Sequence, residues 1–207
     1  MIELLVVIAI IGLLAGILVP AVSKALTSAA MTQTVSAGKS IYTSAFAGQM
    51  DDIVMGGSAA SDWPDSEGDY VPGSAHEYFN DLVTNGLMDV TYDFFSARGV
   101  DRAKKESEFK ENTCAWKLVL GLKKAKDGTP FIFTRNYTAT TIPTGDDKKK
   151  IQEGELEGYN STPFGKDGLV VVMKGGAAVA LKGNSLTEGE FNRAGEKIPT
   201  DLKIVNP

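Results

Sequence analysis

The polarity of the chain changes sharply within its first fifty residues. From Leu4 to Val22 every residue is apolar, Gly or Pro, and no charged side chain follows Glu3 until Lys24. As an α-helix rising ~1.5 Å per residue, this stretch is about 28 Å long, close to the ~30 Å hydrocarbon core of a bilayer. β-branched residues are also common in strands, but strands rarely exceed about 10 residues. The length therefore predicts a membrane-spanning helix.

The helical pattern continues beyond Pro20 to about Gln49. Small and apolar residues recur there mostly at steps of three and four positions, which predicts one packing face. They are Leu26, Ala29, Ala30, Val35, Gly38, Ile41, Tyr42, Ala45 and Phe46. Four polar residues can face water, namely Lys24, Thr32, Gln33 and Lys39. We therefore predict a transmembrane helix over residues 1–23 and an amphipathic continuation over residues 24–50 that enters a globular head.

The remaining residues, 51–207, read as one water-soluble α+β head. A connection rich in Gly, Asp and Ser runs from Asp51 to Gly73. Ser74 and Glu77 then have the spacing of a capping box, which predicts a short helix through Val83 that Gly86 can end. Strands are expected at Thr113–Leu120, Phe131–Arg135, Tyr137–Ile142, Leu169–Lys174 and Ala177–Lys182. A long hydrophobic helix packed on an antiparallel sheet is the predicted fold class.

Two local features refine this picture of the head. Gly175 and Gly176 separate the last two expected strands, as in a two-residue hairpin turn. The highly charged segment from Asp101 to Asn112 is compatible with a helix or with an exposed loop.

Composition and charge exclude some functional classes. The net charge is −5, so the clustered basic surface of a nucleic-acid-binding protein is missing. The basic run Lys148–Lys150 directly follows two aspartates and reads as a solvated loop. Cys114 is the only cysteine, which excludes an intrachain disulfide, and its apolar surroundings favour a small core residue over a reactive thiol.

Candidate chemistry in the head is sparse. His76 is the only histidine, so one Ser–His pair is conceivable, but its place at a helix start favours an ordinary surface role. Phosphate loops, nucleotide fingerprints and Gly-x-Ser-x-Gly elbows are all missing from the sequence, so we expect no enzyme activity and no cofactor. One loop gathers oxygen ligands at a density that can hold Ca²⁺, in an order unlike an EF-hand. These residues are Asp62, Asp65, Glu67 and Asp69.

Three simpler interpretations of the apolar segment compete. A cleaved secretory signal would want basic residues before a shorter apolar run, whereas Glu3 is acidic. The small residues Thr27–Ala30 resemble a cleavage site and leave that interpretation open. A plain membrane anchor fits the length but gives Glu3 no role. A buried core helix lacks enough apolar sequence elsewhere to surround it.

Glu3 needs a cationic partner if it enters a membrane or a helix bundle. A charge at mid-bilayer costs about 2.5–3.5 kcal/mol, and less near the interface. The nearest cation is a terminal amine, which can belong to the same chain or to a neighbouring copy. Pairing across copies would convert an unfavourable buried charge into a device that sets register.

The N-terminal segment resembles the class III signal of type IV pilins and type II secretion pseudopilins. The resemblance rests on the sequence from Ile2 to Ala15, with Glu3 at the position of the characteristic Glu. Gly12 matches the helix glycine of that family, and Pro20 falls where its members carry a helix-kinking proline. The family pattern places Gly, Phe, Thr and Leu ahead of Ile-Glu, and this sequence has Met1 at the Leu position.

The resemblance implies a structural subunit that polymerises through its N-terminal helix. In the family, a peptidase removes a leader ending in Gly, the new N-terminal residue is methylated, and the Glu neutralises the amine of an adjacent subunit. Gly12 and Gly16 would let neighbouring helices approach closely, and the helix from Gly12 to Pro20 could loosen as subunits leave the bilayer. We therefore expect Glu3, Gly12, Gly16 and Pro20 to serve assembly.

The implied partners and location follow from the same resemblance. They are further copies of the chain or related subunits, the inner membrane before assembly, a prepilin peptidase and an assembly platform. The final location would be an extracellular filament or a periplasmic pseudopilus. The alternative from another class is a membrane-anchored extracytoplasmic binding module that never polymerises, and an anchored hydrolase would need reactive residues that the sequence does not supply.

Overall fold

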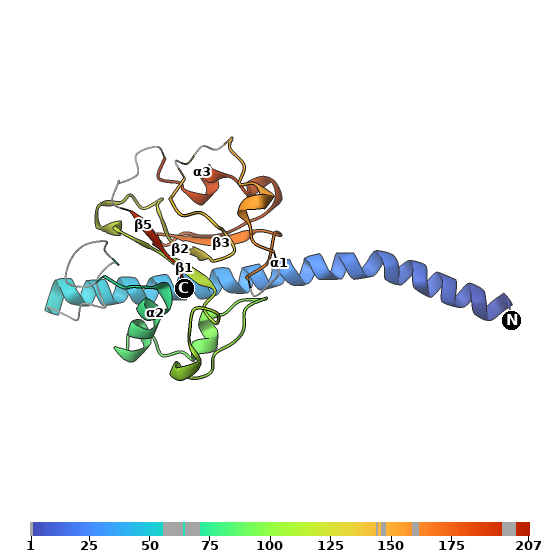
Figure 1. The fold of residues 1–207 in the computed structure, drawn as a ribbon, viewed down its shortest axis with the longest axis horizontal. Coiled ribbons are helices and arrows are strands. Elements are labelled where there is room, and N and C mark those ends of the chain that lie inside the picture. The colour runs from blue at the N-terminus through green and yellow to red at the C-terminus, as the bar shows by residue number, and fades with distance from the viewer. Residues whose placement is uncertain are drawn as a thin grey trace.

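The computed structural model describes residues 2–55, 64, 71–143, 145, 148–158, 162–195 and 202–207. Helix α1 (Ile2–Met55) is a single helix whose first half projects from a head and whose second half lies along that head (Figure 1). The head is built on a five-stranded antiparallel sheet. The predicted α+β fold, a long hydrophobic helix packed on an antiparallel sheet, is confirmed.

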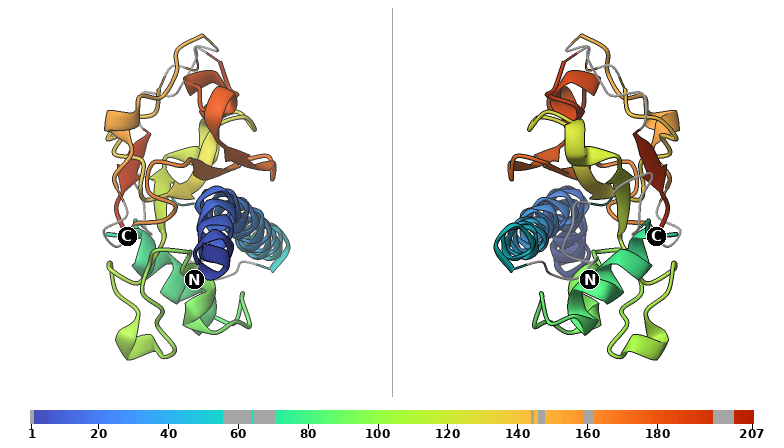
Figure 2. Two further views of the ribbon diagram at one scale, coloured as in Figure 1. Left: turned by 90° about the vertical axis from the view of Figure 1, so that its right-hand side faces the viewer. Right: turned by 90° about the vertical axis from the view of Figure 1, so that its left-hand side faces the viewer.

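The sheet has the strand order β4-β3-β2-β1-β5. Its strands are β1 (Trp116–Leu120), β2 (Pro130–Thr134), β3 (Leu169–Met173), β4 (Ala178–Leu181) and β5 (Lys203–Val205). The first three strands are buried along their whole length, because both faces of the sheet are covered. In Figure 2, α1 and the small helix α3 (Glu188–Phe191) lie on opposite sides of the sheet.

The predicted turn between β3 and β4 is present. The N–H of Gly176 donates to the Met173 carbonyl at 2.9 Å, and the N–H of Met173 donates to the Ala177 carbonyl at 2.7 Å. Gly176 has a φ of +83°, a conformation that a residue with a Cβ seldom adopts. The two glycines therefore join the strands as expected.

Helix α2 (Ala75–Thr84) begins with the expected cap, in a slightly altered form. Ser74 Oγ accepts from the N–H of Glu77 at 3.2 Å. The Glu77 carboxylate accepts from the N–H of Gly73 at 2.9 Å, one residue before the position that a capping box uses. The helix is followed by Gly86 with a φ of +73°, and it packs against β1.

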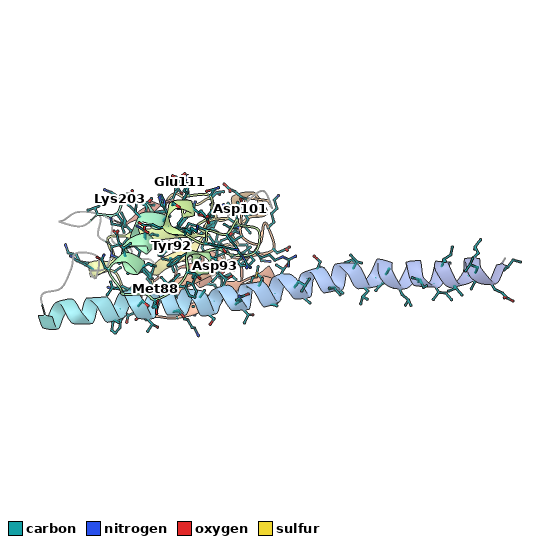
Figure 3. All side chains as sticks on the ribbon, turned by 90° about the horizontal axis from the view of Figure 1, so that it is seen from below. Met88, Tyr92, Asp93, Asp101, Glu111 and Lys203 are labelled. Atoms are coloured by element: carbon teal, nitrogen blue, oxygen red, sulfur yellow. The ribbon has the colours of Figure 1, made fainter. Side chains whose placement is uncertain are left out.

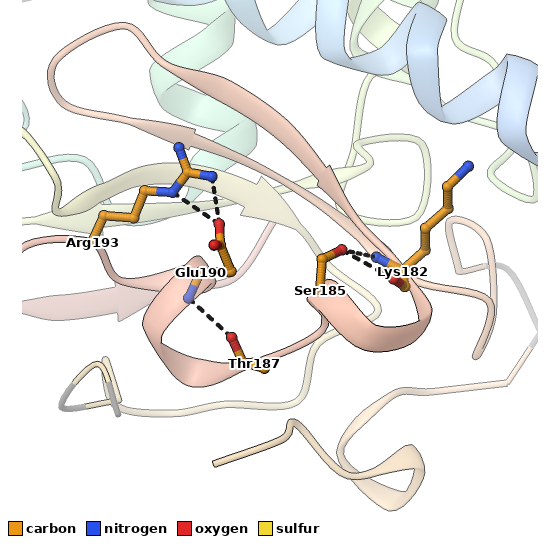
Figure 4. Close-up of polar contacts among 5 residues, drawn as sticks. All are labelled: Lys182, Ser185, Thr187, Glu190 and Arg193. Atoms are coloured by element: carbon orange, nitrogen blue, oxygen red, sulfur yellow. Dashed lines mark hydrogen bonds and ion pairs between the residues drawn. The ribbon is translucent and has the colours of Figure 1, made fainter. Parts of the chain in front are cut away.

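The opposite face of the sheet is closed by the segment around α3. Phe191 places its ring edge-on against Phe133 of β2, with centroids 5.1 Å apart. Thr187 Oγ1 caps α3 by accepting from the N–H of Glu190 at 3.2 Å, and Arg193 pairs with the same Glu190 at 2.5 Å (Figure 4). These local bonds hold a four-residue helix that is too short to be stable by itself.

The second half of α1 is the spine of the head and contacts β3 and β4. Its fully buried positions follow a strict alternation of four- and three-residue steps: Thr27, Met31, Thr34, Gly38, Ile41 and Ala45. The predicted packing face was only partly right, because Leu26, Ala29 and Phe46 are exposed. The four residues expected to face water are exposed.

Two threonines in the buried face were missed because hydropathy alone disfavours them. Thr27 Oγ1 donates to the Ser23 carbonyl at 3.1 Å, and Thr34 Oγ1 donates to the Ala30 carbonyl at 3.0 Å. Each hydroxyl thus donates a hydrogen bond within its own helix, so burial leaves neither donor unpaired.

Several other boundaries also need correction. The segment Tyr137–Ile142 is not a strand, and only Tyr137 forms a single bridge, with Leu156. The chain turns there because the Asn136 side-chain amide donates to the carbonyls of Gly165 and Gly168, each at 2.8 Å. Strand β5 was not expected at all.

The remaining corrections concern helix ends and the charged segment. Helix α1 continues to Met55, beyond the expected end near Gln49. The connection expected from Asp51 lies largely outside the described residues. The segment 101–112 forms turns around a short 3₁₀ helix at Glu106–Glu108, so the loop alternative is correct.

At Gly38 the helix α1 packs closely on the sheet, and substitution of this residue tests that packing. An added Cβ would lie 2.5 Å from Val172 Cγ2 and 3.1 Å from Trp116 Cη2. We expect Gly38→Ala to destabilise the head by about 1–3 kcal/mol, the usual cost of overpacking. Chemical denaturation followed by tryptophan fluorescence would measure it.

Gly16→Ala is the matched control, because an added Cβ at Gly16 meets nothing within 4 Å. It should leave the unfolding midpoint of the head unchanged. Equal midpoints for Gly38→Ala and wild type would contradict the close packing of α1 on β3.

Candidate functional site

The first half of α1 has no cover from the rest of the described chain. Residues 2–26, called the rod below, are all exposed. The exposed fraction of their large apolar side chains runs from 45% at Val22 to 81% at Ile2. Figure 3 shows these side chains standing out on every side of the helix. The rod is thus apolar around its circumference, unlike the one-sided helices of soluble proteins.

α1 is long and apolar enough to cross a membrane, judged by length and composition. The most apolar part of the helix makes no buried contact with the head. A core helix of a soluble protein would be mostly buried, so that interpretation of the segment is excluded.

Only two charged residues lie on the rod, one near each end. Glu3 occupies the first turn of α1, and Lys24 precedes the head by three positions. Both side chains are exposed, and no described residue forms an ion pair with either. The acidic end of the rod also coincides with the positive end of the helix dipole, which favours a carboxylate there.

The other three predicted assembly residues lie between these charges. Gly12 and Gly16 are one helical turn apart, and an added Cβ at either would meet nothing within 4 Å, so both leave space at the rod surface. Pro20 lies inside α1 without ending it. Its missing N–H removes the usual donor to the Gly16 carbonyl, and the rod is visibly curved in Figure 1.

The point where α1 enters the head, called the neck below, is held by two cations. Arg98 Nη1 donates to Thr27 Oγ1 at 2.7 Å, and Lys182 Nζ donates to Ser28 Oγ at 2.7 Å. In Figure 4 the Lys182 side chain extends towards α1. The partners lie 71 and 154 positions apart in sequence, so no local pattern could reveal them.

The only histidine has a local role at the start of α2. His76 Nδ1 lies 2.9 Å from Ser74 Oγ, and the same oxygen caps the helix. The described hydrogen bonds include none from the other ring nitrogen of His76 to a carboxylate. The Ser–His pair that the sequence allowed is therefore present as a helix-start contact, without the third group that orients a catalytic base.

The head has a shallow cavity of about 850 Å³ beside the start of β1. Two of its cations are engaged with the backbone: Lys117 Nζ donates to the Tyr137 carbonyl at 2.9 Å, and Arg135 donates to the carbonyls of Glu111 and Asn112. Burial lowers the pKa of Lys117. These contacts tie strands to loops and account for the placement of both basic groups.

Two further candidates from the sequence have different outcomes. Cys114 is fully buried, and burial raises the pKa of its thiol to about 12, so the prediction of a core cysteine is confirmed. The acidic loop proposed for Ca²⁺ lies outside the described residues. Among the residues that the structure does describe, no group of three His, Cys, Asp or Glu side chains is placed to hold a metal.

Cys114 should be chemically silent in the folded protein. At pH 8 the thiolate is scarcely populated, because this pH lies far below the thiol pKa of about 12. The sulfur is also buried, so the reagent cannot reach it. We expect Ellman's reagent to react at least ~100-fold more slowly with the native chain than with the chain in guanidinium chloride. Rapid native labelling would show that the β1 region opens readily.

The chain matches no family model, no protein with a curated description and no solved structure.

Proposed function

We propose that this chain is a structural subunit of a filament of the type IV pilus or type II secretion pseudopilus class, and that it polymerises through α1. The observation that carries the proposal is the rod: an apolar helix, exposed on all sides, that continues without a break into the spine of a folded head. The resemblance of residues 2–15 and Pro20 to the pilin signal supports it.

The energetics of the rod require that something cover it. Burying a large aliphatic side chain is worth roughly 1.5–3 kcal/mol. The rod carries Leu, Ile or Val at most of its positions, so a bare rod in water would aggregate. Before assembly the inner membrane covers it, and after assembly the rods of neighbouring copies do.

Two features favour assembly over a permanent anchor. Glu3 adds a charge that a simple membrane helix would do better without, whereas a filament can pair it with a cation of a neighbouring copy. Gly12 and Gly16 remove side-chain bulk from one face, which allows helices to approach closely.

Processing and delivery follow from the family resemblance. A prepilin peptidase and an assembly platform in the inner membrane would act on the chain before it enters an extracellular filament or a periplasmic pseudopilus. The head, which is anchored to α1 at the neck, would then face outward from the bundle.

Replacement of Glu3 tests its role in assembly. Glu3→Leu should leave membrane insertion intact, because it makes the rod more apolar, yet lower incorporation into sheared filaments by about tenfold or more through loss of the ion pair. Glu3→Gln, which keeps the size and removes the charge, should behave in the same way. Membrane fractionation and immunoblotting of sheared material measure both effects.

Normal filament yield from both variants would remove the pairing role. For the wild-type chain, electron microscopy of sheared surface material with an antibody to the head tests the proposal itself. A protein that always stays monomeric in the membrane fraction would favour the anchored binding module.

A further inference from the structure

Three cations gather where the rod meets the head. Thr27 Oγ1 accepts from Arg98 Nη1 at 2.7 Å, and Ser28 Oγ accepts from Lys182 Nζ at the same distance. Lys24 precedes these two hydroxyls by three and four positions. Side chains at those spacings are neighbours on one side of a helix, with Cβ atoms about 5–6 Å apart. Lys24 therefore lies one turn away from both contacts, on the side of the rod.

No carboxylate of the described chain forms an ion pair with these cations. The hydroxyls that hold Arg98 and Lys182 are neutral, and a guanidinium or an ammonium has further N–H donors beyond the one used here. Like charges at such short separations repel each other. An anion from outside the chain would therefore relieve this repulsion and occupy donors that the protein leaves open.

The loops around the neck keep this region basic. The N–H of Phe164 donates to the Arg98 carbonyl at 3.2 Å, and an added Cβ at Gly168 would lie 3.1 Å from Lys182 Cβ, so the loop 162–168 lies beside both neck cations. Lys24 and the segments 91–102, 162–168 and 181–185 contain five basic and three acidic residues, although the whole chain has a net charge of −5. They are Lys24, Arg98, Arg102, Lys166 and Lys182, with Asp93, Asp101 and Asp167.

The length of the rod places this basic region at the surface of a bilayer. With Leu4–Val22 across the hydrocarbon core, Lys24 lies about 3 Å beyond its edge, and Thr27 and Ser28 lie about 8–9 Å beyond it. The headgroup layer extends about 5–8 Å on each side. Helical side chains tilt towards the N-terminus, so both hydroxyls and the cations bonded to them lie on the membrane side of their own Cα atoms.

We propose that the neck binds the phosphate groups of anionic phospholipids, in the leaflet from which the head emerges, through Lys24, Arg98 and Lys182. The inference rests on the proposed function, because it concerns the membrane stage before assembly. A lipid fits better than a free phosphate, since the neck adjoins the bare apolar surface of the rod. Val22 and Leu26 are 45% and 57% exposed there, so acyl chains can lie against them while the headgroup meets the cations.

The assignment gives the head itself a part in membrane binding. Arg98 and Lys182 come from segments far from α1 in sequence, and each bonds to α1 at the neck. Arginine binds phosphate through two parallel N–H groups, whereas lysine acts as a point charge. A phosphate between them would hold the head close to the bilayer surface in one orientation.

Lipid selectivity of the full chain in detergent micelles tests the contact. Phosphatidylglycerol, which is anionic, and phosphatidylcholine, which is zwitterionic, would be supplied in equal amounts with identical acyl chains. Mass spectrometry would quantify the lipid that stays with the purified chain. Each Lys or Arg near an anionic lipid surface favours binding roughly fivefold. We therefore expect wild type to retain phosphatidylglycerol with at least ~10-fold preference, and equal retention of the two lipids would overturn the proposal.

Removal of the two head charges separates the neck from the rest of the surface. Arg98→Gln combined with Lys182→Gln should lower the preference by at least ~5-fold, although each Gln amide can still donate to the neck hydroxyls. Lys124→Gln combined with Lys203→Gln is the matched control and should keep the preference. Both control residues are exposed, and Lys203 lies at the end of the head away from the rod (Figure 3), where it pairs with Leu120. Equal selectivity of the two double variants would contradict binding at the neck.

A variant that keeps both charges guards against a purely structural effect. Arg98→Lys combined with Lys182→Arg should retain most of the preference for phosphatidylglycerol, since both positions stay cationic. Loss of selectivity in this variant would show that the charges themselves do not bind the lipid.

Inorganic phosphate distinguishes a lipid headgroup from a free anion. Added in large excess during washing, it should leave phosphatidylglycerol bound, because the acyl chains remain on the rod. Displacement of the lipid would indicate a site for the free anion and overturn the membrane contact. A chain that shows the lipid selectivity but never forms filaments would remove the proposed function alone, and filaments from a chain without selectivity would remove the neck contact alone.

Discussion

The main constraint on this molecule is a helix that is apolar on all sides and that the rest of the described chain leaves exposed. Residues 2–26 gain nothing from the head, because every contact that buries α1 begins at Thr27. The part of α1 before Thr27 thus needs apolar surroundings from outside the chain, and the part from Thr27 onward is packed on the head. The head is stable through its own sheet and aromatic packing, whereas the rod depends on material from outside the chain.

The boundary between these two environments is sharp. Leu26 is exposed and Thr27 is buried, and the two neck bonds from Arg98 and Lys182 fall on Thr27 and Ser28. Hydrogen bonds from charged donors are stronger than those between neutral groups. They hold the helix against the head at the position where cover from the sheet begins, and Pro20 lies seven positions before Thr27, within the rod.

The sequence was sufficient for the features that depend on local chemistry. The rod follows from an uninterrupted apolar run, α2 from its Ser74 cap, and the β3–β4 turn from Gly175 and Gly176. The predictions failed where residues distant in the sequence determine the local structure. Strand β5 has only three residues, and it is a strand because Ile204 pairs with Val119 of β1. The Asn136 side chain, bonded to two distant glycine carbonyls, turns the chain where β-branched residues suggested a strand.

Within the candidate site, the two rod charges and the glycines could be read directly from the sequence, but the neck could not. Continuity of α1 through the neck has a mechanical consequence. The head has no rotational freedom of its own about the rod, because no loop separates them. Insertion of one residue between Pro20 and Thr27 would turn the head by about 100° around the helix axis and move it by only ~1.5 Å along that axis. The number of residues in the rod therefore sets the direction in which the head points.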